Sequence, residues 1–307
     1  MWILLGVWVV MFWNVECLFD PFDDPLKNDD EFTAGALRHW TWSRFEKKRD
    51  GIAQTILALA DVTGDLPALV GLAEVENRLV VSQLVRKTLL DELGYGYVHR
   101  ESPDERGIDV ALLYRKDIFR ILSVDSLTIP GVKTRDILYV RMVQIPDQVR
   151  DDERECLHVF VVHFPSKRGG ARVSDGRRAA AMGVLERAVD SLQRIEPAGR
   201  ILVMGDFNEV AINVSGLAAP PIGARPAAPG TLKYHGRWER IDHFFVSPSL
   251  EAQMQIFAPP FLLEDDPAYL GTKPRRTYIG PRYHGGLSDH LPIYLRVDGN
   301  RLSTSEK

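Results

Sequence analysis

The sequence is poor in cysteine and has no excess of positive charge. Cys17 and Cys156 are the only cysteines among 307 residues, which excludes a disulfide scaffold and the paired-cysteine zinc motifs. The 38 basic residues are outnumbered by 42 acidic ones, so the formal net charge is −4. A chain of this charge lacks a global basic field with which to hold nucleic acid. A polyanionic substrate would therefore depend on local arginines and a bound cation.

The sequence also lacks a hydrophobic run long enough to cross a bilayer as a helix. Its most apolar stretch, residues 1–13, falls short of the roughly 20 residues that a span requires. It has neither the basic start nor the small-residue cleavage site of a signal peptide. We interpret it as a buried strand, with a truncated leader in front of it as the alternative. We expect no membrane span, and a cytoplasmic location unless such a leader directs export.

Short apolar runs recur along the chain, and amphipathic stretches lie between them. The runs include PALVGLAEV, CLHVFVVHF and RILVMGDFN, which are typical of strands buried on both faces. Apolar positions at helical spacing indicate helices over residues 42–60, 77–93 and 174–195. This alternation favours a layered α/β domain. No biased linker divides it, so we expect one domain over residues 1–300 and a disordered tail at 301–307.

Polar side chains gather at or near the ends of the expected strands. They are Asn14, Glu16, Glu74, Asp206, Asn208, Asp242, Asp289 and His290. Any one alone could be a turn or cap residue. Together they indicate a site, because ligands bind at strand ends in α/β sheets. If the carboxylates converge, a divalent cation would relieve their repulsion, and oxygen ligation suits Mg²⁺, Mn²⁺ or Ca²⁺ rather than zinc.

Six motifs carry a family resemblance: WNVECLFD, GLAEVEN, VVHFPSKRGG, VMGDFNE, RIDHFFVS and GGLSDHLPIYL. In this order they resemble the endonuclease/exonuclease/phosphatase superfamily, which includes DNase I-like nucleases, abasic-site endonucleases, sphingomyelinases and inositol phosphate phosphatases. The resemblance runs from about Phe12 to Leu295. The segments EFTAG and RGIDVALLYR are similar to those of a bacterial branch often labelled endonuclease-like. It implies a four-layer α/β sandwich, in which two mainly antiparallel sheets pack face to face with helices outside.

The resemblance implies a metal site. Glu74 matches the principal metal-ligating Glu of the family, and Asn14 matches an Asn that contacts phosphate or metal. Glu16 stands where some members have Asp, which makes its match weaker. Asp289 matches the acid beside an Asp–His pair. We expect these side chains around Mg²⁺ (or Mn²⁺ or Ca²⁺), which would act as a Lewis acid on the phosphate.

The resemblance also implies catalytic roles. His163 matches a His that contacts the phosphate or assists the leaving oxygen, and Asp206 and Asn208 match a pair that orients water and binds a phosphoryl oxygen. Asp242 and His290 match the Asp–His pair, in which the carboxylate would fix the imidazole tautomer and raise its pKa. The sequence leaves open whether Asp206 or His290 is the general base.

Basic residues near the motifs are candidates for substrate binding. Lys167, Arg168 and Arg276 lie in loops next to the motifs, and an arginine fork matches phosphate oxygens. The alternative is that they are ordinary solvated charges. His158 and His243 lie inside expected strands, and we interpret both as structural.

The predicted function is metal-dependent hydrolysis of a phosphodiester by in-line attack of water, with a nuclease acting on nucleic acid as the leading interpretation. The first alternative is a phosphatase or phosphodiesterase acting on inositol phosphates, phospholipid head groups or nucleotides. The second is a binding protein that kept the fold and lost the chemistry. No feature indicates a stable protein partner, so we expect a monomer.

Overall fold

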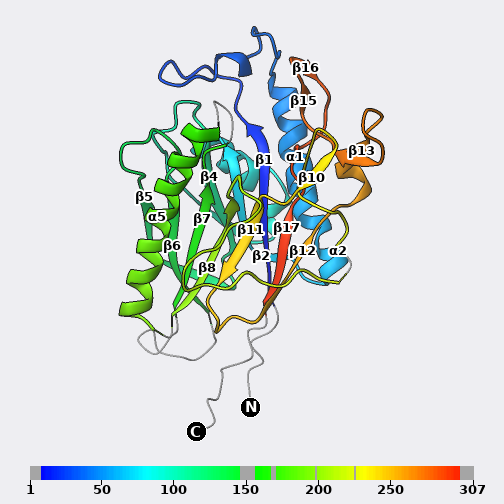
Figure 1. Cartoon of the computed structure of the whole chain (residues 1–307). Helices are drawn as coiled ribbons and strands as arrows, with labels where there is room; N and C mark the ends of the chain where they lie inside the picture. Colours follow the sequence, from blue (N-terminus) through cyan, green and yellow to red (C-terminus); the bar gives the residue numbers. More distant parts are fainter. Residues whose placement is uncertain (1–7, 146–155, 167–170, 198, 225, 298–307) are drawn as a thin grey trace.

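Two β-sheets pack face to face in the computed structural model (Figure 1). The model describes residues 8–145, 156–166, 171–197, 199–224 and 226–297. One sheet has the strand order β12 (Ala252–Ile256), β17 (Ile293–Val297), β1 (Trp8–Leu18), β2 (Pro67–Val75), β4 (Asp109–Arg115) and β3 (Tyr95–His99). The other has the order β11 (Asp242–Val246), β8 (Arg200–Asp206), β7 (Cys156–His163), β6 (Ile137–Gln144) and β5 (Phe119–Leu127). In these sheets β1 pairs parallel with β2 and β7 with β8, and the other neighbours run antiparallel.

Strands β7, β8 and β11 of the second sheet are buried on both faces, as the apolar runs predicted. Along β7, Leu157, Val159 and Val161 enter the core between the sheets. Phe160 and Val162 point to the opposite face and pack in a second core beneath α5. Side chains alternate across a strand, so an unbroken apolar run can fill two cores at once.

Helices cover the outer faces of both sheets, which confirms the predicted four-layer α/β sandwich (Figure 1). α5 (Ala171–Ile195) packs on the second sheet, whereas α1 (Trp42–Ala58) and α3 (Arg78–Arg86) contact the first. The short helical elements are η1 (Asp30–Phe32), α2 (Ala60–Thr63), α4 (Leu89–Glu92) and η3 (Pro260–Leu262). Three small ribbons pair β9 (Leu232–Tyr234) with β10 (Arg237–Glu239), β13 (Leu263–Asp265) with β14 (Thr272–Pro274), and β15 (Tyr278–Ile279) with β16 (Arg282–Tyr283).

All three helix predictions need correction. The helix expected over residues 42–60 ends at Ala58, and the short α2 begins at Ala60. The helix expected over residues 77–93 is broken into α3 and α4, because Thr88 adopts an extended conformation and its side chain caps α4 by accepting from the backbone of Leu90. The helix expected over residues 174–195 begins earlier, at Ala171. None of the helices in the described ranges combines the length and the hydropathy of a membrane span.

The first strand runs beyond the apolar run that predicted it. β1 continues through Asn14 to Leu18, and its register with β2 shifts between these two residues. Glu16 and Cys17 at this irregularity have positive φ angles of 48° and 53°. Such a bulge re-aims side chains at the end of a strand. Here it lies where the polar residues gather.

Candidate active site

The predicted site residues from both sheets meet at one edge of the sandwich. Asn14, near the end of β1, donates from Nδ2 to Oδ2 of Asp206 at the end of β8 over 3.0 Å. The same amide lies 3.4 Å from Oε1 of Glu74 at the end of β2. Asn14 therefore links the first sheet to the second. We refer to the place where the side chains of Asn14, Glu74 and Asp206 meet as the crevice. Asn14, Glu74 and Asp206 are distant in sequence, and the packing of the two sheets brings them together.

Glu74 is aimed into the crevice by a bulge. Its φ is 63°, and the pairing of β2 with β4 shifts register across it. Positive φ is uncommon outside glycine and clusters at functional sites. Nε2 of His163, at the end of β7, lies 3.7 Å from Oε1 of Glu74. The bulge thus places the carboxylate against residues of the opposite sheet.

Cys17 holds the other oxygen of Glu74. Its backbone N–H donates to Oε2 over 2.9 Å, and its Sγ lies 3.2 Å from the same oxygen. Burial, together with the charges of Glu74 and Glu16, raises the pKa of the Cys17 thiol well above its usual value. The protonated thiol is therefore a donor to Glu74. This role of Cys17 was not predicted from the sequence, because the positive φ that turns the residue toward Glu74 has no signature in its residue type.

Asp206 lies at the centre of the site. Nε2 of His163 is 3.6 Å from its Oδ2, and the backbone N–H of Asn208 donates to its Oδ1 over 2.9 Å. The Asn208 amide donates to the carbonyl of Phe164 over 3.0 Å. Burial and the charge of neighbouring Asp242 raise the pKa of Asp206 to about 7. The negative charge of Asp242 thus favours binding of a proton or a cation to the Asp206 carboxylate.

His290 and Asp242 form the predicted pair. Nδ1 of His290 lies 2.9 Å from Oδ2 of Asp242, and its Nε2 lies 3.9 Å from Oδ2 of Asp206. Burial opposes a charge on His290, but the carboxylates of Asp242 and Asp206 outweigh it and hold the pKa of His290 well above its usual value. Trp13 donates from Nε1 to the His290 carbonyl over 2.9 Å, and Ser288 accepts from the His290 N–H. The imidazole is therefore held from both backbone and side chain.

The donor set fits a hard divalent cation. Asp206, Asp242 and His290 each offer a ligand atom within 4.8 Å of the others, and all three are buried. Oδ1 of Asp242 is buried and has no hydrogen-bond partner. Glu74 and Asn14 add oxygen ligands across the same crevice. Carboxylate and amide oxygens are what Mg²⁺ and Mn²⁺ prefer.

Glu16 and Asp289 engage an arginine. Arg276 donates from Nε and Nη2 to Oε1 of Glu16 over 3.1 and 3.0 Å, and from Nη2 to Oδ2 of Asp289 over 2.9 Å. The backbone N–H of Thr277 donates to the second oxygen of Glu16 over 2.7 Å. Both carboxylates thus have protein donors, and Arg276 has two carboxylate partners. Metal binding by Glu16 and Asp289, and substrate binding by Arg276, stay predictions.

Two further cationic residues, Lys48 and Arg135, donate hydrogen bonds to the backbone of site residues. Lys48 donates to the Glu16 carbonyl and to Oγ1 of Thr277, and Arg135 donates to the His163 carbonyl over 3.0 Å. The sequence analysis missed both. Lys48 lies three residues after Phe45 in α1 and is buried with it, so a cation on an apolar helix face was the available signal. Arg135 carried no such signal. Lys167 and Arg168 lie outside the described residues.

The two histidines interpreted as structural are held within the fold. His158 in β7 contacts the Tyr139 hydroxyl at 2.8 Å and Glu196 at 3.1 Å. Nε2 of His243 lies 2.8 Å from the Glu209 carbonyl. Each ring thus has partners away from the crevice.

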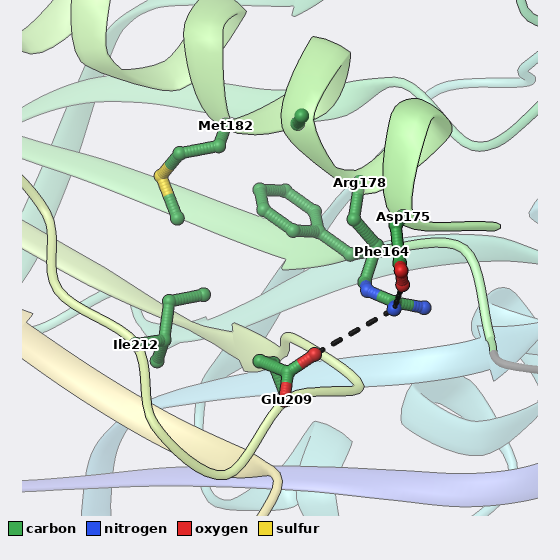
Figure 2. A pocket seen from close by; sticks show the side chains of 7 residues that line it. Phe164, Asp175, Arg178, Met182, Glu209 and Ile212 are labelled. Atoms are coloured by element: carbon green, nitrogen blue, oxygen red, sulfur yellow. Dashed lines mark hydrogen bonds and ion pairs between the residues drawn. The ribbon is translucent and has the colours of Figure 1, made fainter. Parts of the chain in front are cut away.

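A pocket of about 230 Å³ lies beside the site (Figure 2). It is lined by Phe164, Asp175, Arg178, Ala179, Met182, Glu209 and Ile212. Phe164 follows His163 and Glu209 follows Asn208, so the pocket adjoins two segments that carry site residues. Arg178 lies at the polar side, 3.6 Å from Glu209, opposite the apolar side chains of Met182 and Ile212 (Figure 2). The pocket can therefore take a group that is apolar on one face and polar on the other.

The model of the Endonuclease/Exonuclease/phosphatase family matches residues 9–219 and 224–299. Truncated TDP2 of Caenorhabditis elegans has a TM-score of 0.61 at 16% identity, over 95% of this chain and 98% of the other. A mannosyl-6-phosphatase of Bacteroides thetaiotaomicron has 0.58 at 16%, over 94% and 99%. The human Nocturnin catalytic domain with bound sulfate has 0.52 at 17%, over 95% and 94%. Identities this low show a shared fold. A search of curated proteins finds no match.

Proposed function

The chain belongs to the endonuclease/exonuclease/phosphatase family, and from this we propose that it hydrolyses phosphoester bonds with a divalent cation. One observation carries the proposal: Asn14, Glu74, His163, Asp206 and the Asp242–His290 pair come together in one buried crevice. Burying such groups together does not favour stability, since buried carboxylates oppose folding. Their presence in one place therefore supports chemistry at this site.

The metal-binding part of the proposal rests on Glu74, Asn14, Asp206 and Asp242. A Mg²⁺ or Mn²⁺ ion held there would offset the negative charge that gathers on the phosphoryl and leaving oxygens. The protein prepares Glu74 for this role by directing the N–H and the thiol of Cys17 to one oxygen, Oε2. The other oxygen, Oε1, faces Asn14 and His163.

The proton-transfer part rests on hydrogen-bond geometry. With Nδ1–H of His290 donated to Asp242, Nε2 faces Asp206 and the crevice. A water between Asp206 and the phosphorus could pass its proton to Asp206, since the neighbouring carboxylates hold the pKa of His290, 3.9 Å away, well above its usual value and keep its ring protonated. The backbone N–H of Asn208 donates to Asp206 and its side-chain amide donates one N–H to the Phe164 carbonyl, which leaves the second amide N–H for a phosphoryl oxygen. Nε2 of His163 lies 3.7 Å from Glu74 and 3.6 Å from Asp206, and we assign this nitrogen to the leaving oxygen.

For the substrate, we propose a phosphodiester with a nucleoside-sized group, as in a nuclease. The pocket lined by Phe164 and Glu209 supports it, because an apolar wall and a polar rim suit a base or a sugar. The net charge of −4 favours the second candidate, a small phosphate ester such as an inositol phosphate, a phospholipid head group or a nucleotide, over long duplex DNA.

A substrate panel tests the proposal. Purified protein with Mg²⁺ is incubated with plasmid DNA, single-stranded DNA, RNA, nucleotides, inositol phosphates, sphingomyelin and bis(p-nitrophenyl) phosphate, beside a Glu74→Gln variant. We expect turnover of at least one ester and its loss in the variant. Absence of turnover on every ester, or equal turnover by the variant, would favour a binding protein that has lost the chemistry.

A further inference from the structure

A second group of metal-binding side chains lies outside the crevice, at the base of the loop that joins β3 to β4. His99 ends β3, Asp109 begins β4, and Glu101 follows His99 in the connecting loop. The antiparallel register pairs His99 with Ala111, so His99 and Asp109 share one face of the hairpin. Asp109 Oδ2 lies 3.4 Å from Nε2 of His99, and Glu101 Oε1 lies 3.8 Å from Nδ1. One ligand atom from each residue lies within 4.8 Å of the other two.

Buried polar atoms in this group lack partners. The side chains of His99 and Asp109 are 2% and 3% exposed, yet Nε2 of His99 and Oδ1 of Asp109 have no hydrogen bond. Oδ1 of nearby Asp136 is likewise buried and unpartnered. A buried polar group without a hydrogen bond destabilises the fold, and native proteins rarely tolerate it. Several at one place indicate that something else supplies the contacts.

Basic side chains do not supply them. In the described part of the chain, the ion-pair contacts of Glu101 and Asp109 are both with His99. Nearby Lys27 donates instead to the carbonyls of Ser102 and Asp104 over 3.1 and 2.9 Å. The group thus concentrates negative charge around one imidazole.

We propose that His99, Glu101 and Asp109 bind a zinc-like divalent ion, separate from the ion of the catalytic crevice. The assigned ligands are one ring nitrogen of His99, one oxygen of Asp109 and one oxygen of Glu101. Two ligands at about 2.0–2.1 Å from a tetrahedral Zn²⁺ lie roughly 3.3–3.4 Å apart, close to the Asp109–His99 spacing. One imidazole beside two carboxylates suits Zn²⁺ or a similar transition ion, whereas the catalytic crevice adds the oxygens of Asn14 and Glu74 to its own imidazole and carboxylates and so suits a harder ion. Glu101, with a 60% exposed side chain, gives the ion access from solvent.

The position of this site defines its role. His99 and Asp109 flank residues 100–108, and an ion between them closes the base of that loop. Asp104 of the loop accepts from Arg135 over 3.1 Å, and Arg135 also donates to the carbonyls of His163 and Phe164. The ion therefore stabilises a loop that supports the strand end bearing His163. Its role is structural, and it does not depend on the proposed hydrolysis.

Calorimetry on tag-free, chelator-treated protein tests the site. Zn²⁺ is titrated with excess Mg²⁺ present, into the parent, His99→Gln and His284→Gln. His284 is the matched control, because it also contacts a carboxylate, that of Glu264, but has no third ligand. We expect His99→Gln to lose one Zn²⁺ equivalent that the parent and the control retain. Equal stoichiometry in the parent and His99→Gln would overturn the proposal.

Two further measurements separate this site from the crevice and from a folding defect. Glu74→Gln is expected to retain the Zn²⁺ equivalent; its loss there, with His99→Gln unaffected, would assign the ion to the crevice. Crystals of the parent soaked in Zn²⁺ need no variant. An anomalous peak between His99 and Asp109 would support the site, and density for Zn²⁺ only beside Glu74 would refute it.

Discussion

Nδ1 of His290 lies 2.9 Å from Oδ2 of Asp242, although the two residues are 48 positions apart in the chain. Asp242 begins β11, whereas His290 lies in the turn before β17, so this contact joins the second sheet to the first. The carboxylate orients the imidazole toward Asp206, which is the register partner of Asp242 on β8. The orientation of one ring thus depends on how both sheets are packed.

Replacing Asp242 by Asn should impair turnover far more than stability. An amide can donate to Nδ1 and favours the wrong tautomer of His290, so we expect kcat to fall about 10²–10⁴-fold. The test measures kcat as a function of pH for Asp242→Asn and for Asp265→Asn, a control substitution at an exposed residue. A kcat within a factor of about two of the parent would contradict the assigned role.

Chelation should abolish hydrolysis, and Mg²⁺ or Mn²⁺ should restore it. Because Glu74 is the proposed main ligand, Glu74→Gln should need a higher Mg²⁺ concentration and lose about 10²–10³-fold in kcat. Activity is titrated against Mg²⁺ for the parent, Glu74→Gln and the surface variant Glu31→Gln. Full activity in excess chelator would show that hydrolysis does not require a metal ion.

The thiol of Cys17 should matter as a hydrogen-bond donor. Cys17→Ser keeps a donor to Glu74, whereas Cys17→Ala removes it. The S–H is a weak donor, so this hydrogen bond should contribute about 0.5–1.5 kcal/mol, which corresponds to a roughly 2–10-fold lower kcat/KM in the alanine variant. Steady-state kinetics of both variants check this. If serine proved as damaging as alanine, volume or polarity rather than donation would be responsible.

Loss of Arg276 should destabilise the protein. Glu16 is buried and accepts hydrogen bonds from Nε and Nη2 of Arg276. Because Arg276→Gln removes these donors, it should lower the free energy of unfolding by about 1–3 kcal/mol. Urea unfolding is compared with Arg275→Gln, a change at the exposed neighbour. An unchanged unfolding midpoint with a higher KM would instead support the predicted substrate contact.

Stability should fall as the pH rises through the neutral range because of Glu76. Burial and the charge of Asp20 raise the pKa of Glu76 from 4.5 to about 9 in the folded protein. The unfolded carboxyl loses its proton near 4.5, so the folded state binds more protons between these values. The resulting slope is at most about 1.4 kcal/mol per pH unit. Thermal unfolding from pH 5 to 9 should show a flatter decline for Glu76→Gln; equal slopes would contradict this assignment.

Patterns within short windows were enough to predict much of the architecture. Apolar runs such as CLHVFVVHF became strands buried on both faces, and the ordered motifs implied the four-layer sandwich that the structure has. Burial and strand periodicity are properties of neighbouring residues, so they can be recognised without the fold. The motifs also singled out Glu74, Asp206 and His290, which the structure brings to one crevice.

Contacts between residues that lie far apart in the chain have no comparable local pattern. Arg276 binds Glu16 from 260 residues away, Cys17 turns to Glu74 through a positive φ, and strand register places Asp109 beside His99. Each contact depends on the placement of a bulge, a register or a loop to within a few ångströms. Those placements follow from the packing of two sheets, whose free energy is shared among many distant residues. Residue type and local spacing therefore identify chemical groups, and only their arrangement in space assigns each group its partner.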